Sequence, residues 1–207
     1  MTGSPISARG HDCLAYLTEV EAREIRDEFS KFADYAGRLV FWNGIPREWA
    51  QLWADEHEML TLSSMMGPLM DKTSSRCPKL RKSPKAWKQY IKGASVLFAE
   101  HACHSGTITV LMKSPYDRHE PREGSTYYNI EEPVLHGLCG STALERILCV
   151  HPAVIGAEEV QYEIWPTDRS LSWKRIYGPE CKLRKHYKRK KSLAYLHGKS
   201  QDDNRRT

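Results

Sequence analysis

The sequence shows no long hydrophobic run, and we expect no secretory leader unless these residues are a trimmed mature form. Its longest uncharged stretches, Met59–Met70 and Pro133–Leu144, fall well short of the roughly 18 residues that cross a bilayer. The opening sequence MTGSPISARGHDC has no apolar core of the kind that a secretory signal requires. We therefore expect an intracellular protein, cytoplasmic or nuclear, with no membrane partner.

Cysteine patterns typical of metal centres and redox motifs are also missing. The 207 residues contain six cysteines but no Cys-x-x-Cys pair, which argues against a zinc ribbon and a thioredoxin-like motif. His101, Cys103 and His104 lie close together in the sequence, but their spacing matches no standard metal site, and we interpret them as a helix end. Because no secretory leader is visible, we expect reduced thiols and no bound metal.

The standard phosphate-binding, dinucleotide-binding and hydrolase motifs are absent as well. The sequence contains no GxxxxGK[ST], GxGxxG, HExxH or GxSxG pattern. These absences argue against P-loop NTPases, Rossmann dehydrogenases, zinc peptidases and nucleophile-elbow hydrolases. We expect no resident cofactor.

A net excess of positive charge is found only in the C-terminal tail. The whole chain has 31 Lys and Arg against 26 Asp and Glu. Ten basic and two acidic residues lie from Lys182 onward, so that segment carries +8, and the remaining 21 basic and 24 acidic residues give −3. A slightly acidic body gives no support to nucleic-acid binding. We expect the tail, residues 181–207, to be disordered, but its KHYKRKK run leaves a non-catalytic binding or nuclear interaction protein as an alternative function.

The spacing of apolar residues predicts an α/β fold. Three-to-four spacing, proline starts and glycine stops predict helices over 19–37, 46–60, 61–70 and 83–103. Short β-branched and apolar runs predict strands over 39–42, 107–112, 145–152 and 160–165. The prediction is thus a helical N-terminal region and a small, mostly parallel sheet flanked by helices.

Two groups of side chains are candidates for chemistry. Glu131 and Glu132 directly precede Pro133 after a loop, beside Tyr127, and a carboxylate in a partly apolar setting is suited to catalysis. A surface acidic pair at a strand end is the simpler interpretation. Trp42 ends a predicted strand, and ligands of parallel sheets bind beyond the carboxyl ends of strands. Its indole could stack on a planar ring, although indoles are more often part of a core.

Several fragments between Leu39 and Pro152 match one family pattern in order and approximate spacing. LVFWNG is similar to a strand that ends in Phe-Trp-Ser, and MLTLSS is similar to a segment containing Thr-Leu-Glu-Asp. ASVLFAEHAC resembles a helix with Ser-x-x-Phe-Ala-x-x-Ala, and TITVLM resembles the strand that follows it. NIEEPVL resembles a segment Ile/Val-Glu-x-x-x-Leu with its glutamate in register at Glu131. Together these fragments resemble the ADP-ribosyl cyclase/NAD glycohydrolase family.

The resemblance implies an enzyme that cleaves the nicotinamide–ribose bond of NAD+, which is its substrate and not a cofactor. Glu131 would be the catalytic carboxylate, which stabilises an oxocarbenium-like ribose as nicotinamide leaves. The implied substrate-binding residues are Trp42, Asn43, Ser95, Thr126, Tyr127, Trp87 and Ser63. Among these, Trp42 would stack at the pocket mouth, Ser95 would hold a phosphate, and Thr126 would influence the choice between cyclisation and hydrolysis. Trp87 precedes the ungapped position of the second pocket tryptophan, Ile91, by one helical turn.

The family also implies how the chain divides into lobes. Residues 1–38 and 61–104 would form a helical lobe, and residues 39–60 and 105–180 an α/β lobe that carries the glutamate. The resemblance leaves a homodimer open.

The chain departs from the family at two places. Ser63-Ser64 replaces an acidic pair that helps to recognise the nicotinamide amide, and Ala36 stands where a half-cystine is expected. With Thr126, the lost acidic pair implies a more open, polar pocket, in which we expect hydrolysis to outweigh cyclisation. An ADP-ribosyltransferase is a further alternative, but no triad of an early Arg or His, a Ser/Thr strand and a late Glu is recognisable.

Overall fold

The computed structural model describes residues 15–32, 34–113, 124–140, 142–178 and 181–185. Its helices and strands, in chain order, are α1 (Glu19–Phe29), β1 (Leu39–Asn43), α2 (Arg47–Glu56), β2 (Leu60–Thr61), α3 (Leu62–Met66), α4 (Pro84–Ala102), β3 (Thr107–Met112), α5 (Glu132–Leu135), β4 (Arg146–Val150), β5 (Tyr162–Trp165) and α6 (Ser170–Tyr177). A π-helical turn, Tyr127–Glu131, directly precedes α5.

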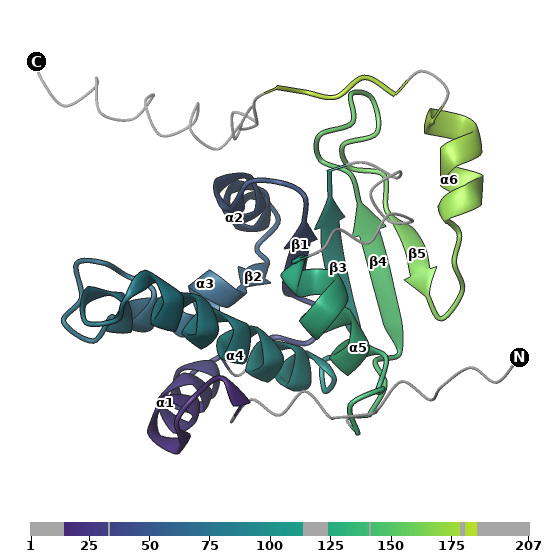
Figure 1. Cartoon of the computed structure of the whole chain (residues 1–207). Coiled ribbons are helices and arrows are strands. Elements are labelled where there is room, and N and C mark those ends of the chain that lie inside the picture. The colour runs from purple at the N-terminus through teal and green to yellow at the C-terminus, as the bar shows by residue number, and fades with distance from the viewer. Residues whose placement is uncertain (1–14, 33, 114–123, 141, 179–180, 186–207) are drawn as a thin grey trace, which may run out of the picture.

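The strands in the described part of the chain form one sheet in the order β2-β1-β3-β4-β5 (Figure 1). β1 pairs in parallel with β2 and β3, and β3 pairs in parallel with β4. β5 joins β4 in the antiparallel direction. The expected α/β class with a mostly parallel sheet is therefore confirmed.

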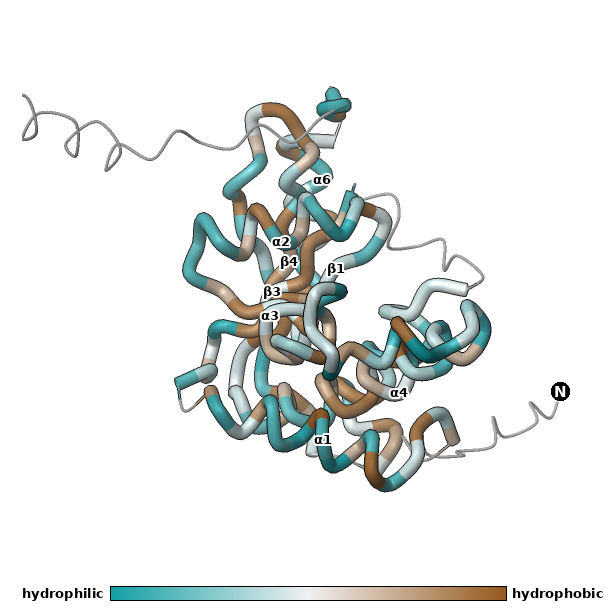
Figure 2. Tube along the Cα trace, turned by 90° about the vertical axis from the view of Figure 1, so that its left-hand side faces the viewer, coloured by the Kyte–Doolittle hydropathy of each residue, from teal (hydrophilic) through white to brown (hydrophobic). Residues whose placement is uncertain are grey.

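Side chains alternate between the two faces of the sheet, as the pleat requires. Leu39 and Phe41 of β1 pack into the larger core with α1, α3 and α4, whereas Val40 packs on the opposite face against α2. Figure 2 shows the central strands in the brown of hydrophobic residues and much of α1 in the teal of hydrophilic ones. The sheet is therefore covered on both faces, which explains why its strands are apolar runs without polar alternation.

The longest helix, α4, begins where the sequence indicates. Ser83 is its N-cap and accepts a hydrogen bond from the backbone N–H of Ala86, and Pro84 occupies the first turn. α1 begins with a reciprocal capping box between Thr18 and Glu21. These two helices pack on each other and against the larger core.

Several expectations need correction. α1 ends at Phe29 and not at Gly37, because Ser30 is the C-cap of the helix. Gly37 lies in a separate turn and has a left-handed φ of 70°. Glu131 and Glu132 lie in a helical segment and not after a loop at a strand end. The short strand β2 and the helix α6 were not predicted.

The start of the basic tail also differs from expectation. Val154 and Leu183 form an antiparallel bridge, and the backbone N–H of Arg184 bonds the carbonyl of Ala153. Residues 181–185 are thus ordered against the body, while the rest of the expected tail, including most of KHYKRKK, lies outside the described residues. In the described ranges, no helix is both long enough and apolar enough to cross a membrane.

Candidate functional site

The candidate site lies where the direction of the sheet topology reverses. From β1 the chain passes through α2 to β2 on one side, and it returns through α4 to β3 on the other side of β1. The carboxyl end of β1 is therefore a topological switch point, the usual location of ligand sites in open α/β sheets. Trp42 and Asn43 are the last two residues of this strand.

A cavity of about 420 Å³ opens at this point, within the usual size range of small-molecule sites. All eight candidate residues from the sequence line it: Trp42, Asn43, Ser63, Trp87, Ser95, Thr126, Tyr127 and Glu131. They come from β1, α3, α4 and the segment around the π-helical turn. The fold therefore brings four distant stretches of sequence to one cavity.

Glu131 is the carboxylate of the cavity and is only 8% exposed. Burial raises the pKa of its carboxyl to about 7, while a hydrogen bond with the Ser95 side chain acts in the opposite direction. Thr126 also lines the cavity, at the start of the same π-helical turn. π-Helical turns are rare and occur often at functional sites. A carboxyl with a pKa near neutral in a cavity lined by aromatic side chains is also typical of functional sites.

One face of α4 forms a wall of the cavity. Trp87, Ile91 and Ser95 follow one another at intervals of four residues, so their side chains lie on the same helix face, and all three line the cavity. Trp87 and Ile91 are the two positions that the resemblance offers for a second pocket tryptophan, and both line the cavity. The Trp87 ring stacks on Tyr90 with ring centres 5.4 Å apart and planes inclined by 20°.

Asn43 offers a buried hydrogen-bond donor to the cavity. Its side chain is 7% exposed, and its Oδ1 accepts a hydrogen bond of 2.8 Å from the hydroxyl of Ser125. Because Oδ1 is the acceptor in this bond, the other terminal atom of the amide is the donor Nδ2. Nδ2 has no hydrogen-bond partner among the described residues. Because an unsatisfied buried donor is costly, Asn43 Nδ2 is suited to an acceptor atom of a bound ligand.

Ser63 and Ser64, which the resemblance aligns with an acidic pair, have different positions. Ser63 lines the cavity. Ser64 instead belongs to the base of α3, where its hydroxyl lies 2.9 Å from Gln51 Nε2 and 3.1 Å from Thr61 Oγ1. Only Ser63 of this pair is therefore placed to touch a ligand in the described cavity.

Sequence reasoning missed three cations that line the same cavity, Arg47, Lys72 and Lys79. Arg47 begins α2, and the two lysines belong to the loop between α3 and α4. A signal was available in that loop, because DKTSSRCPKLRKSP is strongly basic within an otherwise slightly acidic body. Its composition indicated only a polar loop, since spacing alone does not tell which surface a loop covers.

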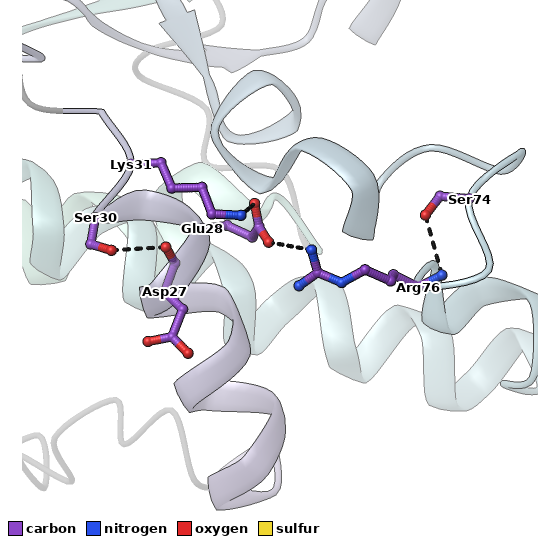
Figure 3. Close-up of polar contacts among 6 residues, drawn as sticks. All are labelled: Asp27, Glu28, Ser30, Lys31, Ser74 and Arg76. Carbon is purple, nitrogen blue, oxygen red and sulfur yellow. Dashed lines mark hydrogen bonds and ion pairs between the residues drawn. The ribbon is translucent and has the colours of Figure 1, made fainter.

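The loop that carries Lys72 and Lys79 is attached to α1 by ion pairs (Figure 3). Arg76 Nη1 lies 2.7 Å from Glu28 Oε1, and Lys31 Nζ lies 2.6 Å from Glu28 Oε2. Burial opposes ionisation of Glu28, but these two cations hold the pKa of its carboxyl below the usual value. A further ion pair of 2.5 Å joins Lys82 of the loop to Glu21 of α1. The loop is thus anchored at two points.

The described residues contain no cluster of three or more His, Cys, Asp or Glu side chains that could hold a metal ion. Near the HACH sequence, Cys103 Sγ instead donates to the carbonyl of Val134 at 3.6 Å.

The fold and the site together define an α/β protein with one buried carboxyl in an aromatic-walled, cation-rimmed cavity at a switch point. No protein-family model, curated protein or solved structure matches the chain.

Proposed function

We propose that this protein is an NAD+ glycohydrolase related in mechanism to the ADP-ribosyl cyclases. The observation that carries the proposal is the buried Glu131 carboxyl, which shares one cavity with Trp42, Trp87 and Ser95. These are the residue types that the cleavage of a nicotinamide ribonucleoside requires. A carboxylate stabilises positive charge on the ribose, and indoles stack on planar rings.

The reaction would need few groups from the protein. The bond between ribose C1′ and the pyridinium nitrogen breaks, its electron pair stays with nicotinamide, and the neutral base leaves without a general acid. The positive charge then resides on the ribose, where the ionised Glu131 stabilises it. Water adds its oxygen to C1′ and loses a proton, which gives ADP-ribose. The open cavity with Ser63 and Thr126 in its lining supports hydrolysis as the main outcome over attack by adenine N1.

The test is NAD+ turnover by the purified chain, followed by chromatography of the products. We expect nicotinamide and ADP-ribose to form, with cyclic ADP-ribose as the minor product. Glu131→Gln keeps the size of the side chain and one oxygen that can accept from the Ser95 hydroxyl but removes the charge, so kcat should fall by roughly 10²–10³.

Glu132→Gln is the matched control, because Glu132 is the adjacent glutamate and does not line the cavity described here. It should retain turnover close to that of the unmodified protein. Normal turnover by Glu131→Gln together with loss in Glu132→Gln would assign catalysis to the neighbouring carboxyl. No NAD+ cleavage by the unmodified protein would overturn the proposal.

A further inference from the structure

The cavity that holds Glu131 has an excess of positive charge at its lining. Arg47, Lys72 and Lys79 line it, against the carboxyl of Glu131. No ion pair joins any of these three cations to a carboxylate within the described residues. By contrast, Arg76 and Lys82 of the same loop are both paired with glutamates of α1. The three unpaired cations therefore remain available to an anionic ligand.

The position of Arg47 is not explained by helix stability. Arg47 is the first residue of α2, and Pro46 before it provides no side-chain cap. A cation in the first turn opposes the helix dipole, so this residue costs α2 stability. Arg47 contributes instead to the positive lining of the cavity.

Of the three cations, Lys79 lies toward the end of the cavity that is remote from Glu131. Ser95, which bonds Glu131, and Trp87 are eight residues apart on α4, and eight residues of helix rise by roughly 12 Å. Lys79 Nζ lies 5.6 Å from the centre of the Trp87 ring, at the outer end of this wall. A ligand whose reacting ribose contacts Glu131 would therefore extend its phosphates and second nucleoside toward Trp87 and Lys79.

The charges of the two nicotinamide dinucleotides differ at that outer end. The diphosphate of NAD+ carries two negative charges, which balance two of the three cations and leave the third without a counter-charge. NADP+ adds a phosphate on the adenosine ribose with roughly −1.5 to −2 charge.

From this balance, and resting on the proposed NAD+ glycohydrolase function, we propose that the cavity selects the phosphorylated dinucleotide, with Arg47, Lys72 and Lys79 as its specificity-determining residues. The cations bind the diphosphate and the additional phosphate together. The reaction at the nicotinamide ribose is unchanged, so the products would be nicotinamide and ADP-ribose 2′-phosphate.

The experiment compares kcat/KM for NADP+ and NAD+ in the full chain and in Arg47→Gln, Lys72→Gln and Lys79→Gln. The unmodified protein should prefer NADP+ by about 10-fold or more at low salt, as expected for one additional charge-assisted contact. At least one substitution should reduce this ratio to near 1, and rising salt should reduce it in the unmodified protein because the cations are exposed. Lys88→Gln is the matched control, since Lys88 is an exposed lysine of α4 outside the cavity lining, and its ratio should not change.

A binding measurement separates this proposal from the glycohydrolase function itself. Calorimetric titration with ADP-ribose 2′-phosphate and with ADP-ribose needs no turnover, and we expect the phosphorylated compound to bind more tightly. If NAD+ is cleaved and kcat/KM for NADP+ is equal or lower, the phosphate selectivity alone is overturned. The same holds if the preference for NADP+ is unchanged in all three substituted proteins. Tighter binding of the phosphorylated compound without cleavage of either dinucleotide would support the cation site and overturn the glycohydrolase function.

Discussion

At the scale of single residues, the decisive feature is that Glu131 is buried and forms no ion pair with a cation of the described residues. Burial raises the pKa of its carboxyl to about 7, and the hydrogen bond with Ser95 offsets only part of this effect. Ionisation of such a buried carboxyl lowers the free energy of unfolding. A site that must stabilise positive charge on a ribose gains from the same arrangement, because a buried carboxylate interacts strongly with a cationic transition state.

The raised pKa predicts the pH dependence of NAD+ cleavage. Because only the ionised carboxyl stabilises the cationic ribose, kcat/KM should fall by about tenfold per pH unit below pH 7 and level off above it. The positive pyridinium of bound NAD+ favours the ionised form, so the midpoint of kcat should lie at a lower pH than that of kcat/KM. Initial rates between pH 5 and 9 measure both profiles, and a flat kcat/KM profile would contradict the role of Glu131.

Stability measurements provide an independent check on the same pKa. Since the folded-state pKa is raised from 4.5 to about 7, the folded protein binds the proton more tightly. The resulting stabilisation is complete below pH 4.5 and is lost as the pH rises through about 7. Glu131→Gln should therefore exceed the unmodified protein in stability at pH 8, by up to about 3 kcal/mol, and lose this advantage at low pH.

At the scale of elements, the loop between α3 and α4 depends on α1 for its position. Arg76 and Lys31 share the carboxylate of Glu28, which is 3% exposed (Figure 3). Lys82 pairs with Glu21. Buried Leu69 and Cys77 also fix this loop to the body, and the ion pairs add attachments near its basic side chains. The same loop carries Lys72 and Lys79, which line the cavity.

Glu28→Gln tests this attachment. The substitution removes the negative charge between Arg76 and Lys31, and we expect a loss of about 1–3 kcal/mol in the free energy of unfolding at pH 7. Because the folded-state pKa of Glu28 is lowered, its stabilisation is present above the unfolded value of 4.5 and lost at lower pH, so the difference should shrink in acid. The KM for NAD+ should also rise, because the loop lysines are less well positioned.

Thermal denaturation at pH 7 and pH 4 and steady-state kinetics measure these effects. Glu24→Gln is the matched control, since Glu24 is exposed on the same helix and forms none of these ion pairs. Equal effects of the two substitutions would show that the Glu28 carboxylate does not hold the loop.

At the scale of the whole molecule, the sheet is stabilised by two apolar cores and not by cross-links between described cysteines. The larger core covers one face of β1, β3 and β4, and the smaller one joins the opposite face to α2. Cys77 and Cys149 are buried within the protein, while Cys139 and Cys181 are half-buried. Cys13 lies outside the described residues.

We therefore expect reductant to leave both activity and the melting temperature unchanged. A structural disulfide would contribute about 2–4 kcal/mol, so its reduction would lower the melting temperature visibly. Mass spectrometry of the alkylated, unreduced protein counts the thiols directly. Three intact disulfides would contradict the expectation of reduced thiols and, with it, the expectation of an intracellular protein.

Local sequence was sufficient wherever an element is defined by its own residues. β1 and β3 are runs of β-branched and apolar side chains, and α4 starts at a Ser-Pro pair that caps a helix in any context. Such elements were predicted to within a residue or two. The two-residue β2 exists only because β1 pairs with it, and the helical turn around Glu131 is too short to show a periodicity. Neither could be predicted from spacing.

The sequence by itself determined the α/β class, the main strands and helices, and the eight residues proposed for the site. It did so because hydrophobic period, capping and a resemblance between short fragments are local properties. Tertiary structure alone decided that these residues share one cavity, that Glu131 is buried against Ser95, and that Arg47, Lys72 and Lys79 line the same space. The physical reason is that burial, pKa and charge balance depend on neighbours that are distant in the chain.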